Sequence, residues 1–346
     1  MLKSNRVEPL VVVSAPKGTE SVHPPQRGDG PVDRVATQFA ELVNAGALDL
    51  PLPGEGRTNE RWMALAAVAA EDLCVARLAE AHVDAIAILN DLRGFEPPPK
   101  SRWGVWAAHP KTPALTAKCR DDEWSLVGTK SFCSGATSCT HALVTADADD
   151  GYRLFAVDLL NARPIPGSWP AVGMAGSESL TVDFDEVAAV AIGEPGAYLD
   201  RPGFWFGASA VAACWYGGAV GLARALLSAH EERELGPHAL AHLGAVDAAL
   251  HSLANTFSAH ADEIDHDPFD VSGLAELRAM QLRATTEEVA RNVLDRVGRA
   301  LGARPLCGDG RHAALAADLP VYVRQSHAES DLERLGTLVL EKGRSW

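Results

Sequence analysis

The order in which helical and strand-like sequence alternates constrains the fold of this chain more than any single motif. Residues 34–46 and 60–92 place apolar residues at helical spacing and are rich in Ala and Leu. Residues 102–200 then change to short segments of Trp, Val, Thr and Phe separated by Gly, Pro and Asp, a pattern typical of a compact β-domain. Long helical stretches return after Gly203, at about 204–232, 239–262, 271–300 and 311–343. The sequence therefore predicts an α+β protein whose β-domain lies between N-terminal helices and a C-terminal bundle of four helices.

These changes of composition divide the chain into four segments. Residues 1–33 hold many prolines and glycines, which forbid long regular elements, so we expect a loose N-terminal arm. A helical domain follows over 34–100, the β-domain over 101–200, and the helical bundle over 201–346.

The β-domain contains a stretch, 124–136, that combines strand residues with an unusual tip. Trp124 and Leu126 suit a strand, and Gly128 is predicted to take the positive φ of a hairpin turn. After Phe132, the residues Cys133, Ser134, Gly135 and Ala136 are all small, so a flat aromatic ligand could lie against this backbone and bond the serine hydroxyl. An ordinary hairpin that enters a buried strand explains the same residues.

A second motif follows at 173–187, where Gly-Met-Ala-Gly-Ser leads into a strand that contains Phe-Asp-Glu-Val. Together with Trp-Ser-Leu-Val-Gly-Thr-Lys at 124–130, this order resembles the central β-domain of the acyl-CoA dehydrogenase superfamily. The resemblance covers roughly residues 35–346 and implies a barrel-like β-domain, a C-terminal four-helix bundle and a homo-oligomer, a dimer or tetramer. Beside the family's N-terminal helical domain, residues 34–100 are shortened.

The resemblance also implies a flavin, FAD in preference to FMN, beside the tip. Phe132 and Ser134 stand where the family has its flavin-side aromatic ring and hydroxyl, with Cys133 and Gly135 in the same tip and Trp106 as further aromatic surface. The tip Phe-Cys-Ser-Gly is closer to the superfamily's flavin monooxygenases than to the Ile-Thr-Asn-Gly form of its dehydrogenases.

Two of the family's phosphate contacts are altered here. The Arg-x-x-Phe-Gly segment between the first two bundle helices is missing. In the later glycine-rich turn, Gly302 stands near the family's glycine pair and Arg304 could bind a phosphate. A helix that ends at Gly302 and an ordinary turn fit these residues equally well.

The position of the catalytic base is also changed. No Asp or Glu occurs between Phe204 and His230, and the family's Tyr-Glu-Gly-Thr loop is not recognisable. The sequence at 322–336 instead reads as continuous helix, which would align Arg324, His327 and Asp331 along one face. This stripe supplies our candidates: His327 as the base oriented by Asp331, Glu329 or Glu333 in place of the lost carboxylate, and Arg324 toward the cofactor. Solvated ion pairs on an exposed helix explain the same pattern.

Composition excludes several functions. A net charge of −15 opposes nucleic acid binding and weighs against an acyl-CoA, although a small-molecule substrate of that kind stays among the candidates. No run of eighteen apolar residues predicts a membrane span, and no apolar signal core stands at the N-terminus, so we expect a cytoplasmic protein. The six cysteines are scattered without a Cys-x-x-Cys pair, so we expect no metal site.

Three functions remain open on the sequence alone. The first is a flavin-dependent oxidoreductase that transfers hydride from an acyl thioester or related substrate to FAD. The second is a flavin-dependent monooxygenase of the same superfamily. The third is a flavin-free homologue that acts as a binding or assembly subunit, which the altered phosphate motifs would suit.

Overall fold

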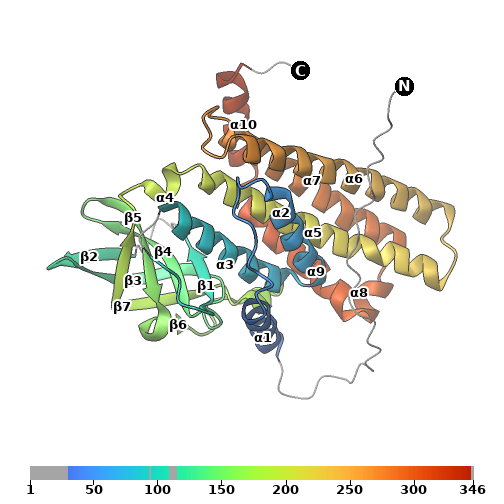
Figure 1. Cartoon of the computed structure of the whole chain (residues 1–346). Coiled ribbons are helices and arrows are strands. Elements are labelled where there is room, and N and C mark those ends of the chain that lie inside the picture. The colour runs from blue at the N-terminus through green and yellow to red at the C-terminus, as the bar shows by residue number, and fades with distance from the viewer. Residues whose placement is uncertain (1–29, 93–94, 109–114, 344–346) are drawn as a thin grey trace.

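The computed structural model describes residues 30–92, 95–108 and 115–343, so the predicted loose arm lies almost wholly outside the described residues. A β-barrel occupies one end of the molecule and long helices occupy the other (Figure 1). Helix α1 begins at Pro31, three residues before the predicted start, and the predicted run at 60–92 forms two helices. The N-terminal helices are α1 (Pro31–Asn44), α2 (Thr58–Glu71) and α3 (Leu73–Leu92).

The predicted β-domain is confirmed as a sheet closed into a barrel. The hydrogen-bonded order is β1-β4-β2-β3-β7-β5, and a further pairing of β4 with β5 closes the circle. Inward-facing Leu, Val and Phe side chains fill the interior, with Lys130 donating to the Thr145 carbonyl oxygen (2.5 Å). The strands are β1 (Trp103–Trp106), β2 (Thr116–Arg120), β3 (Glu123–Cys133), β4 (His141–Ala148), β5 (Gly151–Asp158), β6 (Arg163–Ile165) and β7 (Leu180–Ile192).

The hairpin turn predicted at Gly128 is wrong. Gly128 lies inside the continuous strand β3, where a positive φ of 116° accompanies a shift of register against β7, so it forms a bulge. The turn before β3 is made instead by Asp121 and Asp122, which both take positive φ as a two-residue hairpin requires.

The C-terminal half is helical, as predicted, and packs on both α2 and α3. Helix α5 runs through its centre between α2, α7 and α9. By length and composition α5 is apolar enough to cross a membrane, but most of it is buried within the protein, as in the core helix of a soluble domain. The helices are α4 (Ala197–Asp200), α5 (Gly203–Glu232), α6 (Pro237–His266), α7 (Ala275–Leu301), α8 (Arg304–Gly308), α9 (Gly310–Tyr322) and α10 (Glu329–Glu341).

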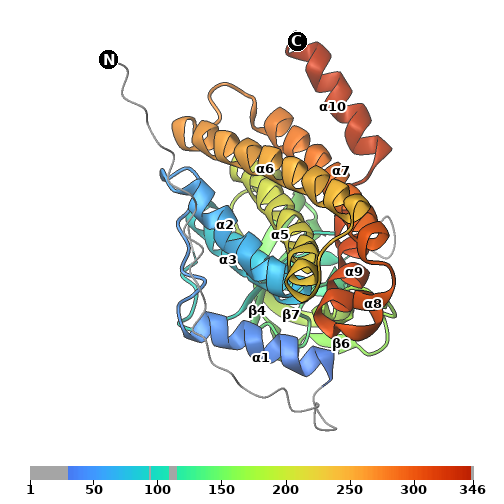
Figure 2. The same cartoon turned by 90° about the vertical axis from the view of Figure 1, so that its right-hand side faces the viewer.

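The single helix predicted over 311–343 is also wrong. Helix α9 continues through Pro320 and passes into a 3₁₀ turn, η3 (Val323–Gln325), after which the chain leaves helical geometry. Ala328 has φ +50°, so α10 starts in a new direction and projects from the body (Figure 2). This break matters because it lies where the catalytic stripe was predicted.

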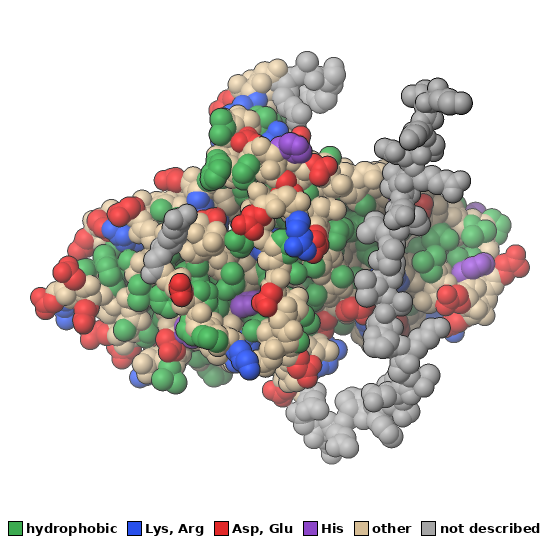
Figure 3. Space-filling view, viewed as in Figure 1, with side chains coloured by type: hydrophobic (Ala, Val, Ile, Leu, Met, Phe, Trp, Pro, Cys, Tyr) green, Lys and Arg blue, Asp and Glu red, His purple; other side chains and the backbone are tan. Residues whose placement is uncertain are grey.

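The surface is predominantly acidic. On the face shown in Figure 3, acidic side chains are spread from the barrel to the ends of the long helices, and basic side chains occur only in small groups among them. This distribution agrees with the net charge of −15.

Candidate functional site

The two sequence motifs meet at one end of the barrel. The Gly135 amide donates to the Ser177 carbonyl oxygen (2.7 Å), and the hydroxyls of Ser134 and Ser179 lie 2.8 Å apart. Phe132, at the end of β3, has φ +60° and turns its ring outward, where it packs edge-on against Trp169. The tip and the turn before β7 therefore form a single surface.

Only part of the predicted tip faces outward from the barrel. The Cys133 sulfur is buried against the Lys130 carbonyl, and a side chain at Gly135 would collide with Leu78. Trp106 is also buried, and its Nε1 donates to the Ser134 carbonyl oxygen (3.0 Å). Trp106, Cys133 and Gly135, predicted as cofactor contacts, thus support the tip from behind.

A cavity of about 830 Å³ lies in front of this surface, at the junction of the barrel and the helices. Phe132 and Ser134 line it, together with Ser177 and Ser179. Helix α3, the first turns of α5 and residues 321–331 provide the other walls. Its aromatic lining consists of Phe132, Trp169, Tyr198, Phe204, Trp205 and Tyr322.

Buried charges from α3 also face the cavity. Arg77 pairs with Glu80 at 2.7 Å, and Asp84 lies one turn further along the same face. Burial raises the pKa of Glu80, against the opposing effect of Arg77, and burial likewise raises the pKa of Asp84. Sequence reasoning missed this row, although four charges on one face of an Ala-rich helix, from Arg77 to Asp91, were a visible signal.

Two further arginines complete the polar lining. Arg201, which follows α4, pairs with Asp91 at 2.8 Å. Arg283, from α7, donates to the carbonyls of Ala208 and Gln325 and lies over the ring of Trp215. The cavity therefore combines aromatic walls with charges, of which Arg77, Glu80 and Arg201 are held in ion pairs.

The break before α10 changes the predicted catalytic stripe but keeps three of its members together. His327 Nδ1 lies 3.2 Å from Asp331 Oδ1, and the His327 backbone N–H donates to the other oxygen of that carboxylate (2.9 Å). Both residues line the cavity, as does Arg324, which pairs with Glu287.

The remaining candidates of that stripe point elsewhere. Glu329 and Glu333 are exposed on α10 and do not line the cavity. As catalytic bases they would have no access to a ligand there.

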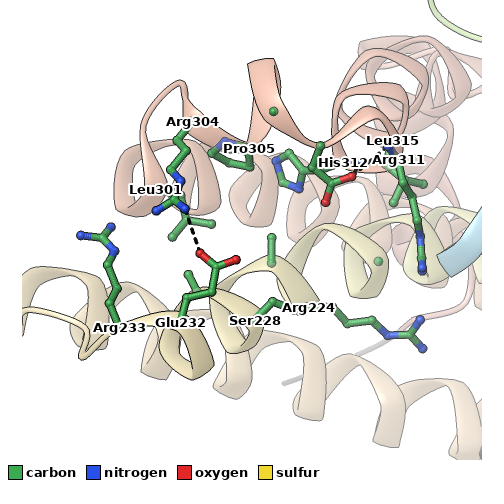
Figure 4. A pocket seen from close by; sticks show the side chains of 15 residues that line it. Arg224, Ser228, Glu232, Arg233, Leu301, Arg304, Pro305, Arg311, His312 and Leu315 are labelled. Carbon is green, nitrogen blue, oxygen red and sulfur yellow. Dashed lines mark hydrogen bonds and ion pairs between the residues drawn. The ribbon is translucent and has the colours of Figure 1, made fainter. Parts of the chain in front are cut away.

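The predicted phosphate contacts belong to a different place. Gly302 ends α7 with φ +65°, and Arg304 lines a second cavity of about 370 Å³, which we call the arginine pocket. Figure 4 shows Arg304 reaching Glu232, a pair 3.0 Å long, with Arg233 beside it. The arginine pocket adjoins the C-terminal part of α5 and the central cavity its first turns, roughly 30 Å apart at 1.5 Å per residue.

The central cavity suits a flat, polar aromatic cofactor. Its volume is within the usual range of roughly 300–1,000 Å³ for small-molecule sites, and serine hydroxyls stand beside aromatic rings. Arg77 Nε and Arg201 Nε are buried without a hydrogen-bond partner, so the polar lining is not saturated by protein. Within the described ranges, no group of three or more His, Cys, Asp and Glu side chains could hold a metal ion.

No family model and no curated protein matches the sequence. Among solved structures, TdsC from Paenibacillus sp. A11-2, in complex with FMN and indole, is similar with a TM-score of 0.73 at 16% identity, over 90% of this chain and 96% of that chain. Methanesulfinate monooxygenase MsuC from Pseudomonas fluorescens is similar with a TM-score of 0.72 at 18% identity, over the same shares.

The 3-HSA hydroxylase from Rhodococcus sp. RHA1 is also similar, with a TM-score of 0.70 at 15% identity, over 91% of this chain and 97% of that chain. By name these neighbours are two monooxygenases and a hydroxylase, and their fold is acyl-CoA dehydrogenase-like. The α+β fold with a barrel-like sheet and a C-terminal helical region, predicted from the sequence, is thereby confirmed, whereas the four-helix bundle stays a prediction. The chain has the acyl-CoA dehydrogenase-like fold in the form that these monooxygenases share.

Proposed function

We propose that this protein is a flavin-dependent monooxygenase that acts on a small molecule in the central cavity. One observation carries the proposal: the hydroxyls of Ser134 and Ser179 and the His327–Asp331 pair line the same aromatic cavity. The likeness of fold to three monooxygenases supports it. This replaces the acyl thioester dehydrogenase as the leading hypothesis.

The serine hydroxyls favour a reduced flavin over an oxidised one. Ser177 Oγ donates its only proton to the Met174 carbonyl oxygen. In the next hydrogen bond Ser179 Oγ must therefore donate to Ser177 Oγ. Ser134 Oγ must then donate to Ser179 Oγ, because Ser179 has no second proton. Ser134 Oγ is then left as an acceptor. Reduced flavin carries an N–H at N5, whereas the oxidised ring has a bare nitrogen there, so an acceptor at the tip suits the reduced form.

We further propose FMN in place of the FAD that the family resemblance first favoured. TdsC and KijD3 were crystallised with FMN. The arginine expected to hold further phosphates, Arg304, lies in the arginine pocket and is paired with Glu232. Arg324, at the central cavity, remains our candidate for the FMN phosphate.

The bound flavin would supply the electrons that activate oxygen for insertion into the substrate. Phe132 and Trp169 would shield the ring from water, and His327 would accept a substrate proton. Since Nδ1 of His327 faces Asp331, the nitrogen available for that proton is Nε2.

Flavin titration and oxygen consumption test the proposal together. We expect photoreduced FMN to bind more tightly than oxidised FMN. The variant Ser134→Ala should reduce this difference in affinity between the two redox states. With reduced FMN and an aromatic substrate, His327→Gln should slow product formation by about 10²-fold and leave FMN binding unchanged. His238→Gln, an exposed histidine outside the cavity, is the matched control. No binding of either flavin would contradict the proposal and support the flavin-free homologue.

The dehydrogenase remains a second candidate, because possible bases line the cavity. They are Glu80 and Asp84 of α3 and the predicted base His327, whereas the alternative predicted bases Glu329 and Glu333 do not line it. Anaerobic addition of an acyl-CoA to the oxidised flavoprotein should leave the band near 450 nm unchanged if the monooxygenase proposal is right. Bleaching of that band would favour the dehydrogenase.

A further inference from the structure

Asp84 differs from the other charges on its face of α3 because no group in the described parts of the protein pairs with it. Arg77 neutralises Glu80, and Arg201 neutralises Asp91. Across the described parts of the chain, no Lys, Arg or His nitrogen lies within 4.0 Å of the Asp84 oxygens, and no hydrogen-bond donor reaches them. Asp84 is half-buried and lines the central cavity.

The facing helix leaves room for this carboxylate. Gly207 of α5 lies opposite, and a Cβ at that position would come within 2.7 Å of Asp84 Oδ1. A few residues earlier, a Cβ at Gly203 would collide with the Arg201–Asp91 pair. Gly203 is the first residue of α5, but Gly207 lies inside the helix, where glycine is unfavourable relative to alanine. Gly207 therefore gives up helix stability to keep space beside Asp84.

An unpaired, half-buried carboxylate is unfavourable for folding. Burial raises the pKa of Asp84, while Arg201, Arg61 and Arg77 act against that rise and Asp91 adds to it. A ligand that donates a hydrogen bond to the carboxylate would recover the lost solvation. Aromatic rings on the neighbouring wall, Tyr198, Phe204 and Trp205, would hold a flat ring system against that donor.

We propose that Asp84 is a substrate-recognition residue that binds the N–H or O–H donor of an aromatic substrate. This inference rests on the proposed function for the identity of the cavity as a substrate site. It adds a substrate class: aromatic compounds that present a hydrogen-bond donor at one edge, in preference to shape-matched compounds that lack it.

Calorimetric titration of the full chain with indole and benzofuran tests the inference. The two ligands have nearly the same shape, but benzofuran has an oxygen where indole has N–H. Because hydrogen bonds to a charged group are strong, we expect the wild type to bind indole about tenfold more tightly or better. Phenol, which has an O–H donor, and anisole, in which a methyl group replaces that hydrogen, make the same comparison for an O–H group.

Two variants separate recognition from support of the fold. Asp84→Leu removes the acceptor and should abolish the preference for indole. Gly207→Ala should displace the carboxylate and reduce the preference, while Asp265→Asn, a half-buried aspartate outside the cavity, should leave it unchanged. Because the wild-type charge is unpaired, Asp84→Leu and Asp84→Asn should melt at or above the wild-type temperature.

Either of two results would overturn the inference. One is a wild type that binds indole no more tightly than benzofuran, or a preference that survives in Asp84→Leu. The other is a lower melting temperature in both Asp84 variants, which would make the residue structural. The titration uses neither flavin nor oxygen, so its failure is distinguishable from a failure of the monooxygenase proposal.

Discussion

The two cavities along α5 hold similar numbers of arginines, but the ion pairs of these arginines differ in exposure to solvent. In the arginine pocket, Arg304 and Glu232 form a pair whose side chains are 72% and 62% exposed. In the central cavity, Arg77 and Glu80 are 13% and 5% exposed. Solvent screens the first pair and leaves the second to interact in a low-dielectric surrounding.

This difference indicates that buried charges, and not exposed ones, mark the functional part of this fold. In a surface cluster such as the arginine pocket, exposed acidic residues pair with most of the arginines, since Arg224 and Arg311 both pair with Glu71, and water solvates the rest. Water cannot solvate the buried charges on α3 in the same way, so each of them needs a partner that is fixed by the fold or supplied by a ligand. We therefore place the chemistry in the central cavity and expect substitutions there to have the larger effects.

The largest effect should come from breaking the buried pair on α3. Arg77→Met leaves Glu80 buried without its partner and should lower the free energy of unfolding by about 3 kcal/mol or more. Urea denaturation measures the loss. The double variant Arg77→Met/Glu80→Leu replaces both charges by apolar groups and should recover most of it. A loss below about 1 kcal/mol in the single variant would show that the row is solvated like the arginine pocket.

The next effect concerns two buried histidines, His82 on α3 and His312 at the arginine pocket. Burial lowers the pKa of His82 on α3 to about 4, and its Nδ1 accepts from the Trp103 backbone N–H. Between pH 6.5 and 4 the unfolded chain then binds a proton that the folded chain does not. Stability should therefore fall as the pH falls through this window, by up to about 3 kcal/mol from His82.

Comparing variants isolates that contribution. Glu80 acts with the opposite sign, because its raised pKa makes the folded state take up a proton as the pH falls, but it is present in every variant compared. His82→Gln should reduce the fall in the free energy of unfolding between pH 6.5 and 4, measured by urea denaturation at a series of pH values. His312→Gln, at the arginine pocket, should reduce it less, since burial lowers the pKa of His312 too but by less than that of His82. Equal reductions by the two variants would contradict the larger lowering of the pKa of His82.

The sequence predicted what depends on local pattern. The order of helices and strands follows from composition, and the two glycine-containing motifs located the tip and the turn that meet at Gly135 and Ser177. Features set by tertiary contacts were missed. Asp121 and Asp122 make the turn assigned to Gly128, and Ala328 breaks a helix without any Gly or Pro nearby to signal it.

The charged row on α3 was missed for a related reason. Spacing shows that Arg77, Glu80 and Asp84 share one face of the helix, but not whether that face meets solvent or a cavity. Only the position of α5, with Gly207 opposite Asp84, decides this. The predicted stripe near α10 is divided for the same reason: the break brings His327 and Asp331 to the cavity and leaves Glu329 and Glu333 on the surface.

The smallest effect should be at the arginine pocket, where Arg304 was first expected to hold a cofactor phosphate. Arg304→Met removes an exposed pair and should change the free energy of unfolding by less than about 1 kcal/mol. Because the cavity that we assign to FMN lies at the other end of α5, the affinity for reduced FMN should stay within about twofold of the wild type. Arg324→Met, at the central cavity, should weaken it by about tenfold through loss of a charged hydrogen bond. The reverse ranking, with Arg304→Met the more damaging, would return the phosphate to the arginine pocket and favour the FAD of the family resemblance.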